Sequence, residues 1–153
     1  MADLIKDIFP PAVAILTIVA VVYIILLPFI AAWKLFKKVG IEGWKALIPV
    51  YNVYLIFKIA GMNGFLCIPV VIINAYNLTY QYINIPNNIK FFILIIGVIA
   101  FIINIFRGIK LSESFGKGTG FTVGMVLLPE IFEIILGMGK AKYQGSYKPK
   151  ESK

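Results

Sequence analysis

Few residues of this 153-residue chain are of types that could do chemistry, and most of those lie in apolar segments. Glu130 and Glu133 are three positions apart in an otherwise apolar run, so on a helix they would share one face. A carboxylate inside a bilayer is costly, and a proton-coupled carrier would use such a pair with Arg107 as its counter-charge. The alternative, which we favour, is that both carboxylates are solvated or salt-bridged at a membrane interface.

A second polar set follows the spacing of a helix. Asn74, Asn77 and Gln81 are separated by three and then four residues and would form one stripe. Asn104 and Arg107, three residues apart near the end of a later apolar segment, would face this stripe if the two segments form a hairpin. In lipid such a stripe turns towards another helix or a wet cavity. Hydrogen bonding between helices is favoured over a transport path.

Catalytic, cofactor and metal sites are not indicated. The chain has no histidine and a single cysteine, Cys67, which excludes a disulfide or a cysteine metal cluster within one chain. None of its serines lies in a Gly-x-Ser-x-Gly pattern. The glycine-rich stretch Gly116–Gly120 contains a lysine but lacks the spacing of a phosphate-binding loop. The sequence therefore predicts a protein that is not an enzyme and carries no cofactor.

The composition is that of a membrane protein. Hydrophobic residues make up 60% of the chain, charged residues 14%, and the mean hydropathy is +0.90. Soluble domains average about 45–50% apolar and about 25% charged residues. The net charge of +8 comes from basic residues beside apolar runs, which favours contact with anionic lipid headgroups rather than nucleic acid.

The elements that must position the polar residues are expected to be helices throughout. Residues 12–33, 64–83 and 91–109 predict three membrane spans, the first too long for a signal peptide. Residues 44–57 and 121–138 are broken by Pro49 and Pro129 and predict re-entrant or interfacial helices, the last being alternatively a fourth span. The whole chain, 1–153, then forms a single membrane domain. Residues 1–11 are expected outside the cytoplasm, and the basic tail 140–153 is expected to be solvated and mobile.

One pattern recurs where these segments meet. Residues 36–44 reappear 21 positions later as residues 57–65, with a looser copy at residues 115–121. Each copy predicts a helix end with lysine in its last turn, a left-handed glycine, a second glycine that frees the next helix to start, and an aromatic residue. The positions that define the first two copies are Gly40, Gly43, Trp44, Gly61, Gly64 and Phe65.

Three further glycines follow a small-xxx-small pattern. Gly116, Gly120 and Gly124 are spaced by four, which allows helix backbones to approach closely. Packing within the chain is favoured over packing between chains.

Three segments also carry a family resemblance: Gly43–Asn52 (GWKALIPVYN), residues 115–121, and Gly137–Gly145 (GMGKAKYQG). They are similar to a family of small bacterial multi-spanning membrane proteins of unknown function, over roughly residues 33–145. The resemblance implies residence in a bacterial inner membrane. Some members are labelled signal peptidase I, but this chain lacks the Ser–Lys pair and the large extracytoplasmic domain of that enzyme.

Charge distribution then orients the chain. If the three repeated turns and the tail share one face, that face holds 13 of the 15 basic residues, leaving Lys6 and Lys90 opposite. The positive-inside rule predicts an external N-terminus and a cytoplasmic C-terminus. The predicted function is that of a membrane scaffold or accessory protein packing against other membrane proteins or its own copies. The alternative is a small transporter or channel using the Asn stripe, Arg107 and Glu130/Glu133.

Overall fold

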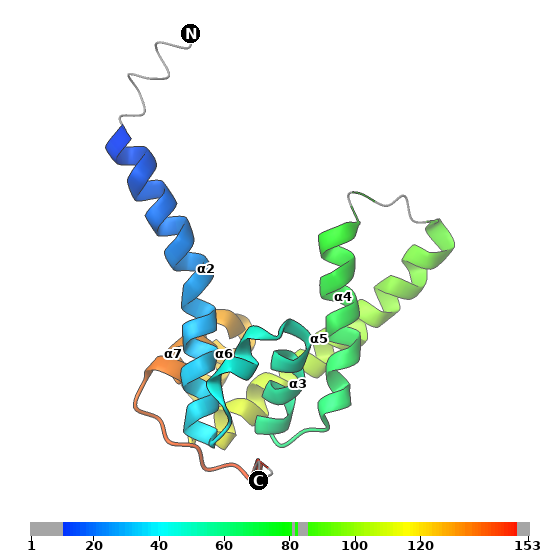
Figure 1. Ribbon diagram of the computed structural model, residues 1–153. Coiled ribbons are helices and arrows are strands. Elements are labelled where there is room, and N and C mark those ends of the chain that lie inside the picture. The colour runs from blue at the N-terminus through cyan, green and yellow to red at the C-terminus, as the bar shows by residue number, and fades with distance from the viewer. Residues whose placement is uncertain (1–10, 81, 83–85, 150–153) are drawn as a thin grey trace.

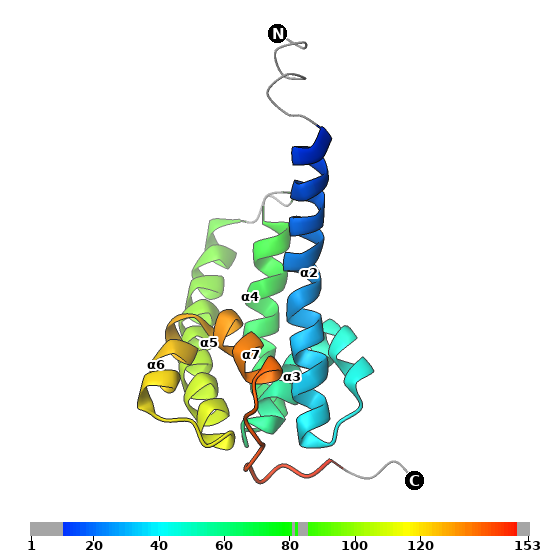
Figure 2. The ribbon, with the colours of Figure 1, turned by 90° about the vertical axis from the view of Figure 1, so that its left-hand side faces the viewer.

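The computed structural model describes residues 11–80, 82 and 86–149, and their regular structure is entirely helical. Short helices form a compact cluster, from which α2 and the α4–α5 hairpin extend in the same direction (Figure 1). Figure 2 shows the cluster from the side, with α6 and α7 against the lower parts of α2 and α5. The elements are α2 (Pro11–Val39), η1 (Gly43–Leu47), α3 (Pro49–Ile59), η2 (Gly64–Leu66), α4 (Cys67–Thr79), α5 (Asn87–Ser114), α6 (Thr119–Leu127) and α7 (Pro129–Met138).

Two of these helices are long and apolar enough to cross a membrane. They cover Val13–Val39 and Asn87–Ser114, with peak mean hydropathies of 3.0 and 2.7. In their most apolar windows 0% and 6% of the residues are buried, whereas the core helix of a soluble protein would be largely buried. Both exceed their expected ranges, 12–33 and 91–109, because the lysines and the serine beyond the apolar runs continue the helix until a glycine turn stops it.

The expected third span, residues 64–83, is wrong as a full-length helix. Gly64–Leu66 forms a separate 3-10 turn, so the α-helix begins only at Cys67 and ends at Thr79. Its 13 residues measure about 20 Å, short of the ~30 Å hydrocarbon core. Residues 81 and 83–85 lie outside the described part of the chain.

The two proline-broken segments are hairpins of short helices. Pro49 and Pro129 are the first residues of α3 and α7. Ile48 and Leu128, which precede them, leave the helical conformation because a proline ring disfavours it in the residue before. A fourth span over residues 121–138 is therefore wrong, since α6 and α7 have only nine and ten residues.

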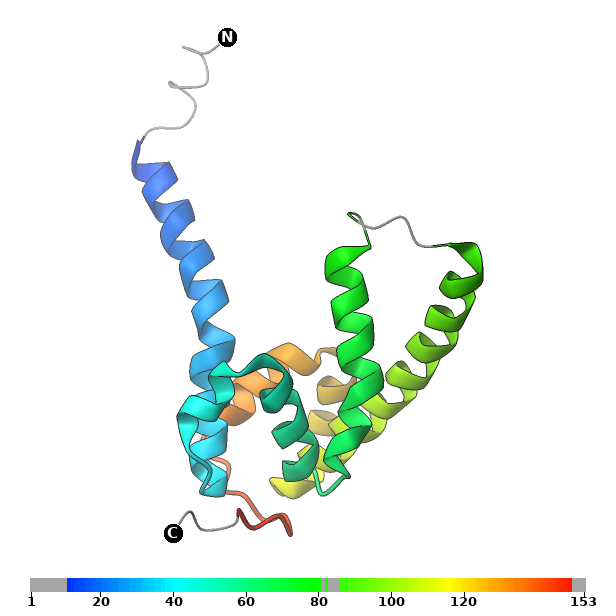
Figure 3. The same cartoon turned by 45° about the vertical axis from the view of Figure 1, so that its right-hand side comes forward.

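The three repeated turns have one backbone geometry. Gly40, Gly61 and Gly116 have φ of 83°, 74° and 61°, the left-handed region that glycine adopts without strain. In each turn the following N–H donates to the carbonyl five residues earlier, at 2.9, 3.0 and 3.1 Å respectively, as in a Schellman cap. The segment after α7 runs along all three turns, at the end of the cluster away from the first turns of α2 (Figure 3). The atoms nearest to a Cβ added at these glycines belong to Pro149, Ser146 and Gln144.

The second glycine in each of the first two turns is needed for close side-chain packing as well as for the start of the next helix. A Cβ at Gly43 would collide with the Trp33 ring, and one at Gly64 with the Tyr54 ring. Because each aromatic residue precedes its glycine by ten positions, the 21-residue repeat extends further back than the turn itself.

The tail is not freely solvated as expected. Its residues alternate between half-buried and exposed from Ala141 to Pro149, and Lys142 and Lys148 are on the exposed side. The Tyr143 hydroxyl donates to the Ile59 carbonyl at 2.9 Å and accepts from the Tyr147 N–H at 3.1 Å. The tyrosines between the lysines hold this segment on the helical cluster.

Helix crossings use small residues other than the expected glycine series. Gly137 of α7 lies so close to the Ala31 backbone of α2 that no Cβ would fit. The series Gly116, Gly120 and Gly124 does not form one face: Gly116 is a turn residue, Gly120 faces open space, and only Gly124 packs closely, against Phe132 of α7. Packing within the chain therefore holds for Gly124 alone.

The buried core lies where these helices cross. It contains fully buried side chains from α2, α3, α5, α6 and α7, among them Phe36, Ile59, Leu111, Met125 and Leu136. The outer half of α2 contributes nothing to it, since every described side chain from Val13 to Leu26 is exposed.

Candidate functional site

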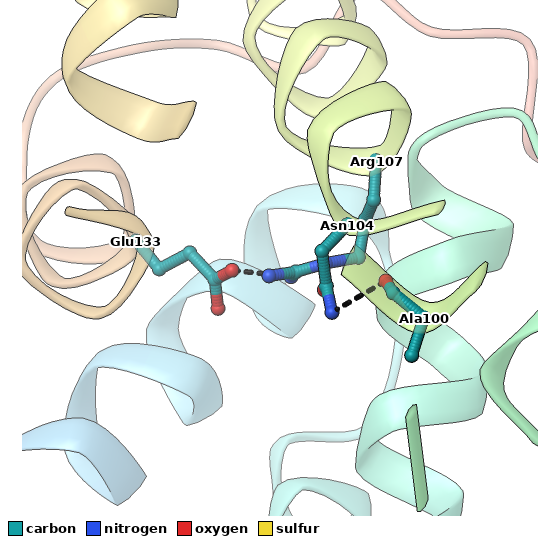
Figure 4. Close-up of polar contacts among 4 residues, drawn as sticks. All are labelled: Ala100, Asn104, Arg107 and Glu133. Atoms are coloured by element: carbon teal, nitrogen blue, oxygen red, sulfur yellow. Dashed lines mark hydrogen bonds and ion pairs between the residues drawn. The ribbon is translucent and has the colours of Figure 1, made fainter. Parts of the chain in front are cut away.

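An ion pair joins α5 to α7 beside the core. Arg107 Nη1 donates to Glu133 Oε1, and Arg107 Nε donates to Asn104 Oδ1 at 3.0 Å (Figure 4). Asn104 Nδ2 donates in turn to the Ala100 carbonyl at 3.1 Å. The side chains of Arg107 and Glu133 are only 11% and 21% exposed. The guanidinium is thus held by two side chains, and its carbon also lies 5.9 Å from the centre of the Phe57 ring.

Local and distant contacts combine in this cluster. Asn104 and Arg107 are one helical turn apart, so α5 alone places them side by side. Glu133 reaches them because α6 packs on α5, with Gly108 against Met125 and Ser112 Oγ 2.7 Å from Thr122 Oγ1, and α7 follows α6 after the break before Pro129. The ion pair thus brings Arg107, the expected counter-charge, to one of the two glutamates, Glu133.

The cluster borders an open cleft of about 550 Å³ between the tips of the two proline-broken hairpins. Val53 and Ile56 of α3 form one side, and Val126, Leu127 and Pro129 form the opposite side. Its polar and charged lining residues are Asn52, Asn74, Asn104, Arg107, Glu130 and Glu133. Five of these six are among the polar residues that the sequence singled out.

The predicted Asn stripe is only partly in place. Asn74 of α4 lines the cleft together with Asn104 and Arg107. Asn77 is exposed and does not line it. Gln81 lies outside the described residues.

Asn52 is the site residue that sequence reasoning missed. It lies in the first turn of α3, and its Oδ1 is buried without a hydrogen-bond partner among the described residues. Most buried polar side-chain atoms in proteins are hydrogen-bonded, so this amide is unusual. The available signal was a polar residue in the first turn of a helix that begins at a proline.

The two carboxylates have different surroundings. Glu133 is paired, whereas Glu130 is exposed and makes no ion pair within the described chain. Glu130 lies in the first turn of α7, where a negative charge stabilises the helix dipole. Both line the cleft and also a neighbouring pocket of about 290 Å³ against Ala31 and Leu35 of α2.

Formal charges decide what the cleft could take. Arg107 contributes one positive charge and the two glutamates two negative ones, so the lining carries a net charge of −1. Carboxylate and amide oxygens beside an apolar wall suit a small cation or a hydrogen-bond donor. Across the described residues no three His, Cys, Asp or Glu side chains gather as metal ligands.

Helices α2 and α5, which are long and apolar enough to cross a membrane and are largely unburied, indicate a helical membrane protein. The profile of a family of unknown function (DUF5684) matches residues 44–146, and the chain belongs to this family. The matched region begins at η1 and includes the whole cleft. No curated protein and no solved structure matches the chain.

Proposed function

We propose that this protein is a non-enzymatic integral membrane scaffold or accessory protein that packs against other membrane proteins or its own copies. The observation that carries the proposal is the exposed apolar surface of its two arms, α2 and the α4–α5 hairpin, which stand apart in Figure 1. Leu16 and Ile18 of α2 are 67% and 63% exposed, and Phe92 and Leu94 of α5 are 65% and 64% exposed. The arms are held apart by the buried cluster below them, so facing apolar surfaces remain available to partner helices.

We further propose an orientation in a bacterial inner membrane, with the N-terminus outside and the tail in the cytoplasm. The turns at Gly61 and Gly116 both lie against the tail. The chain therefore leaves the face of the tail through α4 and returns to it through α5, and the turn at Gly40 lies at the same face. The two proline-broken hairpins begin and end at that face and are then re-entrant. Most basic residues gather there, as the positive-inside rule requires.

The orientation is tested with single cysteines. In a Cys67→Ala background, Lys148→Cys should react with an impermeant thiol reagent only after the cells are opened. Labelling of Lys148→Cys in intact cells would overturn the orientation.

The scaffold proposal is tested by site-specific photo-crosslinking in cells. A photoreactive residue at Leu16 or Leu94 should give one discrete protein adduct, and one at exposed Lys142 should not. The adduct should also co-purify at fixed stoichiometry in mild detergent. Adducts to lipid alone from Leu16 and Leu94, with a monomeric purified protein, would contradict the scaffold role.

A small transporter or channel is the second candidate, favoured by the cleft. Broken helices whose tips meet polar side chains form the solute sites of many transporters. Here Asn52 and Glu130 line the meeting point of two such tips. The net negative lining favours a proton or a small organic cation over an anion.

Flux into proteoliposomes tests this candidate. The parent protein should carry a proton-driven flux that Glu130→Gln with Glu133→Gln abolishes. The control is Glu113→Gln, which removes an exposed carboxylate of α5 outside the cleft. A parent protein without flux, or a flux unaffected by the double substitution, would exclude the transporter.

A further inference from the structure

A further pocket, separate from the polar cleft and from the pocket against α2, lies beside the turns at Gly40 and Gly61, on the face of the helical cluster that the tail covers. It has a volume of about 380 Å³ and is formed by one face of α3, by Lys45 of η1 and by the end of the tail. We name it the lysine–tyrosine pocket after its lining residues Lys45, Lys58 and Lys148 and Tyr51, Tyr54 and Tyr147; Ile41, Leu55 and Pro149 complete it.

The helix spacing of α3 makes one wall. Tyr51, Tyr54, Leu55 and Lys58 are separated by three, one and three residues and so share one helical face. The rings of Tyr51 and Tyr54 stack with centroids 5.9 Å apart and planes inclined by 9°. Lys58 Nζ lies 5.8 Å from the centre of the Tyr54 ring, so the ammonium group lies beside the aromatic wall.

That wall is rigidly held. Gly64 packs so closely on the Tyr54 ring that no side chain would fit between them, and Phe65 meets the ring edge-on at 5.8 Å. The opposite wall is the tail, fixed by the Tyr143 hydroxyl, which accepts the Tyr147 N–H. A pocket built from these two segments is preorganised before any ligand binds.

The charges of the pocket are of one sign. Among the described residues three lysines line it and no carboxylate does. Glu42 pairs with Lys45 at 3.0 Å from outside this lining, and counting it leaves the described lining with a net charge of +2. No hydrogen bond from the phenol oxygens of Tyr51, Tyr54 or Tyr147 occurs within the described chain, so these groups remain available as donors.

We propose that the lysine–tyrosine pocket binds a phosphate group, supplied by the headgroup of an anionic phospholipid at the membrane interface. Ammonium and phenol groups donate to phosphate oxygens, and the tyrosine rings offer an apolar surface to the glycerol carbons beside the phosphate. The pocket lies on the face that collects the basic residues, where headgroups would be within reach. This inference does not depend on the scaffold or the transporter proposal.

The test compares lipids in nanodiscs. Protein in pure phosphatidylcholine is compared with protein in phosphatidylcholine containing phosphatidylglycerol, by counting retained lipid in native mass spectrometry and by thermal unfolding. Unfolding is followed through the thiol of buried Cys67, the only cysteine of the chain. We expect one phosphatidylglycerol per chain to be retained selectively and to raise the melting temperature.

Two matched variants separate a site from general attraction. Lys58→Gln with Lys148→Gln removes two pocket charges and should weaken phosphatidylglycerol binding by roughly tenfold or more. Lys110→Gln with Lys142→Gln removes two exposed lysines outside the pocket and should leave binding unchanged. Lys148→Gln alone changes an exposed tail residue and should give part of the loss without disturbing the fold.

Three outcomes would overturn the proposal. Equal losses in the two double variants would show non-specific surface electrostatics. Equal retention of phosphatidylcholine and phosphatidylglycerol would exclude a phosphate site with anionic selectivity. Protection by inorganic phosphate or glycerol phosphate in solution, without retained lipid, would replace the lipid headgroup by a soluble phosphate compound as the ligand.

Discussion

Replacing Glu133 by glutamine separates the structural ion pair from its unpaired neighbour. The substitution keeps the size of the side chain but removes the charge that faces Arg107, leaving the guanidinium with neutral side-chain partners only. A hydrogen bond to a charged group contributes about 1.5–3 kcal/mol to the free energy of unfolding. Glu133 is about one-fifth exposed and glutamine still accepts one hydrogen bond, so we expect a loss of about 1–2 kcal/mol.

The assay is thermal unfolding in detergent. Unfolding is monitored through the reaction of the Cys67 thiol, which becomes accessible as the protein unfolds. For a chain of this length the loss corresponds to a fall in melting temperature of roughly 2–8 °C. The matched control is Glu130→Gln. Because Glu130 is exposed and makes no ion pair within the described chain, its effect should stay within about 0.5 kcal/mol.

A double-mutant cycle then isolates the pair. Arg107→Met alone should leave the Glu133 carboxylate without its partner, and adding Glu133→Leu should cost less than the sum of the two single losses. Additive losses, or equal effects of Glu130→Gln and Glu133→Gln, would refute the inference that the Arg107–Glu133 pair stabilises the packing of α7 on α5.

The remaining predictions concern the α2–α7 crossing and the tail. Gly137→Leu should abolish folding, seen as loss of a monodisperse peak in gel filtration, because its side chain would occupy the place of the Ala31 backbone. Gly120→Leu places its side chain in open space and should fold and elute like the parent protein. Tyr143→Phe removes the hydroxyl shared by the Ile59 carbonyl and the tail and should cost about 1 kcal/mol in thermal unfolding. Burial raises the pKa of the Tyr143 phenol, so the neutral form is the one that the fold favours. The contribution of Tyr143 to stability should therefore be fully present below about pH 10 and be lost above it. Tyr143→Phe should weaken that fall, which melting curves between pH 8 and 11 would measure.

Local chemistry accounts for the features that were predictable. The three glycine turns depend on hydrogen bonds between residues at most five positions apart, so residue types within one short stretch suffice to specify them. The breaks before Pro49 and Pro129 have the same character, since a proline constrains its own φ and the residue before it. The Asn104–Arg107 contact follows from one turn of α5.

Segment lengths were less predictable. Residues 64–83 are continuously apolar enough to suggest a span, yet the α-helix occupies only Cys67–Thr79. Hydropathy measures the cost of leaving water and does not say where a 3-10 turn gives way to an α-helix. The lysines after Trp33 were expected to mark the end of the first membrane helix, but α2 continues through them to Val39, because charged residues are readily accommodated in a helix.

The sequence by itself determined an all-helical chain, its three turns, its two breaks and its two longest apolar helices. Only the tertiary structure decided which residues lie together: Asn52 and the Arg107–Glu133 pair in one cleft, Gly137 against Ala31, and the Tyr143 hydroxyl against the Ile59 carbonyl. In a soluble helix the apolar stripe marks the buried face. In an apolar chain lipid-facing and protein-facing positions carry the same residue types, so periodicity does not reveal the packed face. The partners of each helix are then selected by close fit and by a few long-range polar contacts, which exist only once the chain has folded.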